Sequence, residues 1–150
     1  MVELALATGT TMLAIQPWPM AMLAEIEVAE RQIEAAIRHA RQALAMSATT
    51  GVSYQQALAE RSIGLAEAAQ GDTDAAIGHL TAGLNLGRRT TGEGYTFHWP
   101  VAFILESLTV VSAEKDPTAS RRWASALLDH ASTIQMGHFV TRARQHLEKL

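Results

Sequence analysis

The sequence predicts an all-α fold: a right-handed superhelix of about three antiparallel helix pairs, followed by a terminal helix. Strong helix formers such as Ala, Leu, Glu, Gln and Arg dominate, and strand signals are almost absent. Helix-breaking residues occur at only a few places, and they divide the chain into lengths of roughly 12–18 residues, as expected for globular helices. A helical segment also recurs forty residues further along the chain, which indicates a helical repeat.

Length and composition restrict the classes of protein to which this chain can belong. Its 150 residues suit one domain, and 48% of them are hydrophobic, which allows a core without disulfides or a structural metal. The absence of cysteine excludes disulfide scaffolds, thiol catalysis and Cys-ligated zinc. A formal charge of −3 argues against a surface that coats nucleic-acid phosphates. We therefore expect no cofactor and no direct nucleic-acid partner.

The first two units can be divided into helices from local signals. In the first unit, about residues 17–48, apolar residues recur at steps of three, four and seven, and we expect a turn at residues 30–32. In the second unit, residues 53–90, Gly71 ends one helix. Asp72-Thr73-Asp74 caps the next helix and places acidic groups at its positive end.

The third unit and the chain end follow the same logic. Within residues 95–133, Asp116 and Pro117 mark the start of a second helix, because Pro is favoured in a first turn. A short terminal helix is predicted over residues 138–150. All units together are predicted to form a single domain.

The internal repeat is the strongest feature of the sequence. Two helical segments share residues at equivalent positions, and each is followed by Thr-Thr-Gly. The repeated positions are Ala36 and Ala76, Ile37 and Ile77, His39 and His79, and Leu44 and Leu84. A repeat of this length predicts stacked helix pairs that bury a continuous core between neighbours.

The second unit resembles the tetratricopeptide repeat family. That family has a small residue midway along the first helix, a Gly-Asp turn, and small and large residues alternating along the second helix. The matching residues are Ile63, Gly64, Gly71, Asp72, Ala76, Leu80, Gly83 and Leu84. Glu60, Glu67 and Arg88 replace the family's usual Trp, Tyr and Pro.

Small residues in this unit predict a close approach of neighbouring helices, because a small residue must face a large one where helices pack tightly. Gly64, Ala76 and Gly83 are placed to accept a neighbour. Glycine inside a helix costs about 1 kcal/mol relative to Ala, so each one needs a packing reason. The sequence supplies none for Gly78 and Gly87.

Units of about forty residues resemble the C-terminal regions of large bacterial transcription regulators of the LuxR and maltose-regulator ATPase type, and of cyclase-linked ATPases. The resemblance spans about residues 17–92, and it rests on the run from Met22 to Glu25, the helix from Ala36 to Leu44, and Arg61. It implies a cytoplasmic, non-catalytic protein–protein interaction module, the sensing or scaffolding part of a regulator.

In such a superhelix, the first helix of each pair lines a concave groove that binds a protein or peptide. Seven residues are candidates for this groove: Trp18, Glu25, Leu58, Arg61, Leu65, His98 and Trp99. We hypothesise that Glu25 and Arg61 anchor the partner through their charges. The aromatic run around Trp99 is expected to rim the groove.

A DNA-binding regulator is the second hypothesis. Residues 56–65 resemble the opening of a repressor-type helix-turn-helix, which would occupy residues 53–80 and place its next helix in the major groove. That next segment contains Glu67 and two aspartates and has no Lys or Arg before Arg88. Such a charge pattern fits phosphate contacts poorly.

An enzyme of unknown class is the third hypothesis. Glu60 and Glu67 lie seven residues apart on one helix face, and paired carboxylates can perform acid–base chemistry. Two helical turns separate them by about 10 Å, so we expect a solvated face instead.

The histidines are the remaining candidates for chemistry. His130, His138 and His146 are spaced by eight residues and do not share a helix face, so we expect no metal site. His39 and His79 occupy equivalent repeat positions, where a half-exposed ring is tolerated.

The N-terminal segment predicts no membrane partner. Met1–Ile15 is apolar, but it lacks a basic start, and Pro17 and Pro19 interrupt it before it reaches a membrane-spanning length. It is more apolar than the cap of a helical repeat should be. We therefore expect an exposed apolar N-terminal face, which predicts a homodimer or a further region upstream.

Overall fold

The computed structural model describes residues 17–89 and 97–150, and these residues form seven α-helices and no strand. The all-α prediction is therefore confirmed for the described part of the chain. The predicted segment Met1–Ile15 lies outside it. The helices are α2 (Pro17–Ala29), α3 (Ile33–Thr50), α4 (Ser53–Gln70), α5 (Thr73–Gly87), α6 (His98–Ser112), α7 (Pro117–Thr133) and α8 (Gly137–Lys149).

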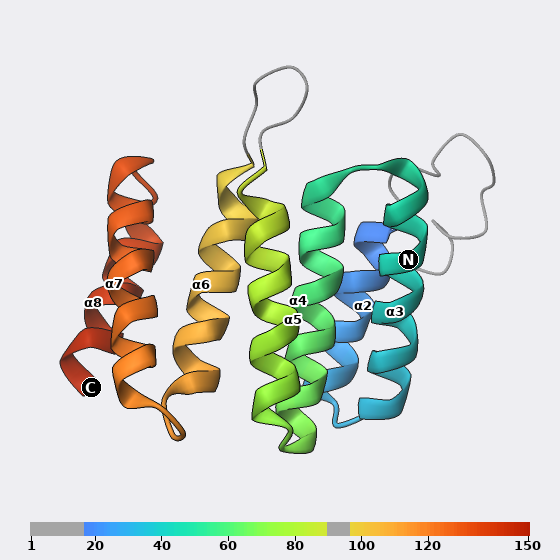
Figure 1. The fold of residues 1–150 in the computed structure, drawn as a ribbon, viewed down its shortest axis with the longest axis horizontal. Helices are drawn as coiled ribbons and strands as arrows, with labels where there is room; N and C mark the ends of the chain where they lie inside the picture. The colour runs from blue at the N-terminus through green and yellow to red at the C-terminus, as the bar shows by residue number, and fades with distance from the viewer. Residues whose placement is uncertain (1–16, 90–96) are drawn as a thin grey trace.

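The helices pack against their neighbours in chain order. Figure 1 shows them side by side, from α2 and α3 at one end of the long axis to α7 and α8 at the other. Each helix contacts the next one in the chain, and α2, α4, α6 and α8 also contact one another in succession. The ranges predicted for the three units cover α2–α3, α4–α5 and α6–α7, and α8 covers that of the terminal helix. Their division into repeat units remains a prediction. The right-handed superhelix remains a prediction.

The turn between α2 and α3 lies where the sequence places it, at residues 30–32. Arg31 adopts a left-handed backbone conformation there, with φ of 63°. Gly71, forty residues later, occupies the equivalent turn between α4 and α5 with φ of 89°. The repeat therefore extends to backbone conformation, although only the second unit has the residue that suits it.

Arg31→Gly should stabilise the protein by up to about 1 kcal/mol, because a left-handed conformation costs roughly 1–2 kcal/mol for a residue with a Cβ and little for glycine. Part of that gain is offset by the greater entropy of glycine in the unfolded chain. Urea unfolding monitored by circular dichroism measures the difference. Gly71→Ala is the matched reversal and should destabilise by about 1 kcal/mol. Equal stability of both variants and the wild type would contradict this account of the turn.

The predicted helix caps are present. The backbone N–H of Ala75 donates to the Asp72 carboxylate at 3.0 Å, and the N–H of Ala119 donates to Asp116 at 2.8 Å. These are the only first-turn side-chain caps among the helices whose N-cap is described. Asp72 caps α5 and Asp116 caps α7. Each aspartate therefore fixes the point at which the preceding turn ends and the helix begins.

Small residues allow α4 and α5 to pack closely. A Cβ atom at Gly64 would lie 2.8 Å from Cγ of Leu80, and one at Gly83 would lie 2.9 Å from the carbonyl oxygen of Ala57. Both distances are too short for a real side chain, which confirms the packing reason predicted for these glycines. The buried positions also repeat every forty residues. They are Ala36 and Ala76, Ala40 and Leu80, Ala43 and Gly83, and Ser47 and Gly87.

The two glycines without a predicted reason differ from each other. A Cβ atom at Gly87 would lie 3.3 Å from Cγ2 of Val101, so this glycine brings the end of α5 close to α6. A Cβ atom at Gly78 would meet nothing within 4 Å. The packing of the described residues therefore gives no reason for glycine at position 78.

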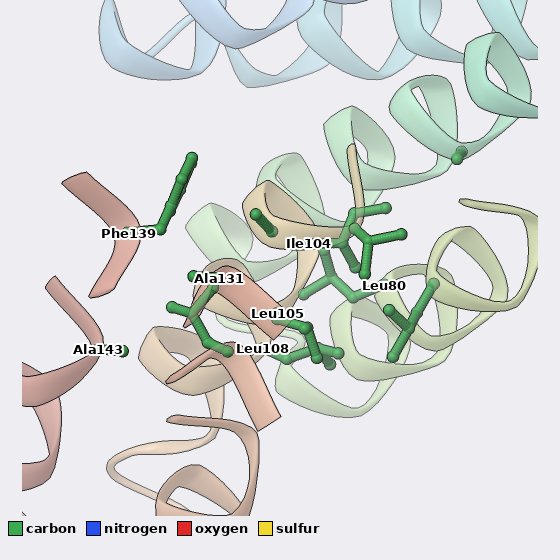
Figure 2. Packing of buried hydrophobic residues seen from close by; sticks show 12 residues of the cluster. Leu80, Ile104, Leu105, Leu108, Ala131, Phe139 and Ala143 are labelled. Carbon is green, nitrogen blue, oxygen red and sulfur yellow. The ribbon is translucent and has the colours of Figure 1, made fainter. Parts of the chain in front are cut away.

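The largest core cluster joins the second half of the molecule. It contains Ala57 from α4 and Leu80 and Leu84 from α5, and α6, α7 and α8 contribute the rest. Figure 2 shows its members, among them Leu80, Ile104, Leu105, Leu108, Ala131, Phe139 and Ala143. This core holds α6 beside α4 and α8 beside α6, and α6 carries part of the candidate site.

α4 bears on the helix-turn-helix hypothesis. It runs without interruption from Ser53 to Gln70, so residues 56–65 and the segment after them form one helix. The turn that a helix-turn-helix requires near Gly64 is not present, because Gly64 packs against α5 inside a continuous helix.

Candidate functional site

A pocket opens on the face where α2, α4 and α6 meet. Its volume is about 210 Å³. Its lining comes from all three helices: Trp18, Met22 and Glu25 from α2, Leu58 and Arg61 from α4, and Trp99 and Phe103 from α6. On each helix these residues are three or four apart, so they lie on one face. We call this cavity the aromatic pocket.

The structure brings five of the seven predicted groove residues into the aromatic pocket. They are Trp18, Glu25, Leu58, Arg61 and Trp99. Leu65 is half-buried one turn beyond Arg61 on α4, and His98 is exposed at the start of α6; neither lines the pocket.

Sequence reasoning missed Met22 and Phe103. Met22 lies four residues after Trp18, and Phe103 lies four residues after Trp99. Extending each predicted position by one helical turn would therefore have found them.

Aromatic rings form one continuous group in and beside the aromatic pocket. The ring centroids of Trp18 and Trp99 are 6.4 Å apart, and those of Trp99 and Phe103 are 6.0 Å apart, both in edge-to-face geometry. Tyr54 lies 6.3 Å from Trp99 and 4.4 Å from Phe97. These rings come from three helices, and their mutual packing holds the pocket walls in place.

Large apolar side chains at the pocket remain accessible to solvent. Trp18 is 42% exposed and Met22 is 47% exposed. Ile26, one further turn along α2, is also exposed. α2 therefore presents an apolar stripe at residues 18, 22 and 26. Clustered exposure of this kind, unlike scattered apolar residues, is typical of interaction surfaces.

The two charged residues of the pocket are paired with each other. The Arg61 guanidinium donates to the Glu25 carboxylate through Nη1, and its Nε donates to the hydroxyl of Ser107 at 3.0 Å. Its Cζ atom also lies 5.2 Å from the centre of the Phe103 ring. Arg61 is only 15% exposed and Glu25 is 32% exposed. The charges predicted to anchor a partner are thus committed within the chain, where they connect α2, α4 and α6.

His98 takes part in a different contact. Its carbonyl oxygen accepts a hydrogen bond from Nε2 of His130 on α7 at 3.0 Å, and the two rings lie 5.4 Å apart. Burial lowers the pKa of His130 below the usual value for histidine. The hydrogen bond to the His98 backbone opposes this effect, whereas electrostatic repulsion from His98 and Arg88 adds to it. This contact connects α6 and α7 beside the pocket, outside its lining.

Two equivalent histidines pair with glutamates of the preceding helix. His39 Nδ1 lies 2.8 Å from a carboxylate oxygen of Glu27, and His79 Nδ1 lies 2.7 Å from one of Glu60. Both rings are half-exposed, as predicted. The prediction of a solvated face for Glu60 and Glu67 was wrong. Their side chains are only 15% and 14% exposed, because both contact residues on neighbouring helices. Glu60 contacts His79 on α5, and Glu67 contacts Arg41 on α3.

A larger hollow, of about 570 Å³, lies at the turn between α2 and α3. Its lining is mainly exposed and polar, with Arg31, Gln32, Glu34, Arg38 and Gln70. A surface that is open and already hydrated gains little from an apolar occupant. The smaller aromatic pocket is therefore the better candidate site.

Over residues 17–89 and 97–150, no three His, Asp or Glu side chains gather in a group able to hold a metal ion. None of the helices described is long and apolar enough to cross a membrane. No family model matches the chain, and no curated protein matches it. The function of the site is therefore argued from its geometry.

Proposed function

We propose that the protein is a non-catalytic interaction module whose aromatic pocket binds an apolar side chain of a partner protein or peptide. In this proposal the helix pairs form a right-handed, tetratricopeptide-like superhelix, and α2, α4, α6 and α8 line its concave face. The observation that carries the proposal is the aromatic pocket, where exposed aromatic and thioether side chains from three helices meet.

The size and chemistry of the pocket support a side chain as its occupant. A volume of about 210 Å³ is below the roughly 300–1,000 Å³ of usual small-molecule sites. Trp, Phe and Met side chains give large contact areas, and Met22 can adapt its shape to different occupants. Arg61 and Glu25 neutralise each other, so the pocket offers no free charge to a partner. An uncharged apolar group therefore enters the pocket at a lower electrostatic cost than a charged group would.

The biological setting that we propose is the sensing or scaffolding part of a cytoplasmic bacterial transcription regulator. This part of the proposal rests on the resemblance of residues 17–92 to the helical repeats of such regulators. A homodimer through an apolar N-terminal face remains a prediction, since Met1–Ile15 lies outside the described residues.

The proposal is tested with a displayed library of short random peptides selected on the purified protein. The selected peptides should share a large apolar residue. Trp99→Ala should weaken their binding by at least about tenfold, because truncating a central aromatic residue removes more than 1.4 kcal/mol. Of the chain's three tryptophans, two line the pocket, so a Trp123→Phe background makes tryptophan fluorescence report on the pocket alone.

Trp123→Ala is the matched control for Trp99→Ala when both are made in the otherwise wild-type chain and compared by binding of a labelled peptide, since this half-buried tryptophan lies on α7 and does not line the pocket. Circular dichroism establishes that each variant keeps its helices. Peptides that bind the Trp99→Ala variant as tightly as the wild type would refute the proposed site. A selection that yields no apolar consensus would also refute it.

A further inference from the structure

The face that carries the aromatic pocket continues onto α8, where its character changes from aromatic to basic. Trp99, Phe103, Glu106 and Val110 form one stripe on α6, because they are spaced by four, three and four residues. His138, Arg142, His146 and Lys149 form the corresponding stripe on α8. We call the latter the basic stripe.

Contacts between the two stripes show that they face each other. The rings of Phe103 and Phe139 lie 5.2 Å apart, and the ring of His138 lies 5.6 Å from Phe139. One turn further along α6, Glu106 Oε1 lies 2.5 Å from Nε of Arg142 and 3.5 Å from Nε2 of His146. The basic stripe therefore begins next to the aromatic pocket and runs along α6.

The stripes end at another hollow, of about 390 Å³, which is distinct from the one at the turn between α2 and α3. We call it the second hollow. Val110, His146 and Lys149 line it, together with Glu114 just beyond the end of α6. Val110 is the most exposed large apolar side chain among the described residues. An apolar surface with basic groups along one edge thus extends beyond the aromatic pocket.

The charged side chains that the basic stripe itself exposes, Arg142 and Lys149, are positive. Glu106 is only 9% exposed and is already paired, whereas Arg142 remains 44% exposed. Glu25 is likewise committed to Arg61.

Lys149 is exposed and forms no ion pair with a described residue. Glu114 supplies an acidic side chain to the lining of the same hollow. Glu148, the one acidic residue of α8, is six positions from Arg142 and so points to another side of the helix.

We propose that the partner segment is an acidic peptide: a large apolar side chain occupies the aromatic pocket, and carboxylates of the same segment contact the basic stripe. This inference rests on the proposed function of the pocket and specifies its partner. From Phe103 to Val110, α6 rises by about 10 Å. That distance equals roughly three residues of an extended peptide or seven of a helical one, which sets the spacing between the apolar residue and the carboxylate.

The test uses synthetic peptides that carry one Phe, followed at either spacing by Glu, Gln or Lys. Binding is followed by the fluorescence of Trp18 and Trp99 in the Trp123→Phe background. The Glu peptide should bind about two- to fivefold more tightly than the Gln peptide, as expected for an exposed ion pair, and the Lys peptide should bind most weakly. The preference should shrink at high salt, because exposed charges are screened.

Lys149→Glu should abolish or invert the preference for the Glu peptide, while the Gln peptide binds as before. Arg144→Glu is the matched control, since it makes the same change of charge two residues from Arg142, on another face of α8. It should leave the preference unchanged.

The outcomes separate this inference from the proposed function. If Phe peptides bind and Trp99→Ala weakens them, but Glu, Gln and Lys peptides bind equally, the acidic partner is wrong and the pocket stands. If replacing the peptide's Phe by Ala has no effect, or no peptide binds, both proposals fall. Concentration-dependent dimerisation in sedimentation experiments that Trp99→Ala abolishes would identify a second copy as the occupant, and would overturn the acidic-peptide proposal.

Discussion

Gly83→Ala should destabilise the protein by about 2 kcal/mol, and Gly64→Ala by a similar amount. Each added methyl group would meet backbone: the carbonyl oxygen of Ala57 at 2.9 Å for position 83, and that of Ala76 at 3.0 Å for position 64. Backbone cannot move aside cheaply, and overpacking of this kind costs typically 1–3 kcal/mol even though Ala favours helix more than Gly does. Thermal unfolding should show a decrease in Tm of roughly 6 °C for either variant.

Gly78→Ala is the control for this prediction. It lies on the same helix as Gly83, and its added methyl group would meet nothing within 4 Å. Only the helix propensity changes, so the variant should be more stable by roughly 0.5–1 kcal/mol. If all three glycine variants shift stability in the same direction, α4 and α5 do not approach as closely as the structure shows.

Arg61→Met should destabilise the protein by about 2 kcal/mol, while Arg41→Ala should change its stability by less than about 0.5 kcal/mol. Arg61 connects three helices through Glu25, Ser107 and Phe103, and losing one partner of a largely buried pair leaves the other without compensation. The expected loss is smaller than the about 3–5 kcal/mol typical of a fully buried pair, because Glu25 is 32% exposed and can be hydrated. Arg41 is 66% exposed and lies 3.8 Å from Glu67.

A double-mutant cycle with Glu25→Gln measures how much of this effect belongs to the pair. Urea unfolding of both single variants and of the double variant should give a coupling free energy of about 1 kcal/mol. A coupling near zero would show that Arg61 stabilises through Ser107 and Phe103 alone. Because Arg61 has this structural role, Arg61→Glu is a poor test of binding, and Trp99→Ala is the better one.

Much of the fold could be predicted because its signals are local. Asp72 and Asp116 cap helices through backbone groups three residues away, and the turn at Gly71 depends on one residue's conformational freedom. The repeat predicted which positions are buried, since Ala36 and Ala76 face the core in equivalent ways. The turn at residues 30–32 was also predicted, although no glycine or proline marks it.

The candidate site could be predicted only in part. Position within the repeat selected Trp18, Leu58 and Trp99, because residues at equivalent places on the first helices face the same side. The same reasoning treated Arg61 and Glu25 as charges available to a partner. It missed that they face each other, since they are 36 residues apart in the sequence and meet only when α2 packs on α4.

By itself, the sequence determined an all-α chain of repeated helix pairs, the places where helices begin and end, and the glycines where they approach. These features depend on backbone propensity and periodicity, which operate within a few residues. The tertiary structure alone decided that Glu25 neutralises Arg61, that Glu60 pairs with His79, and that basic side chains of α8 face the stripe of α6 next to the aromatic pocket. Such contacts depend on the rotation and offset of neighbouring helices to within a few ångströms, and hydrophobic periodicity does not encode that quantity.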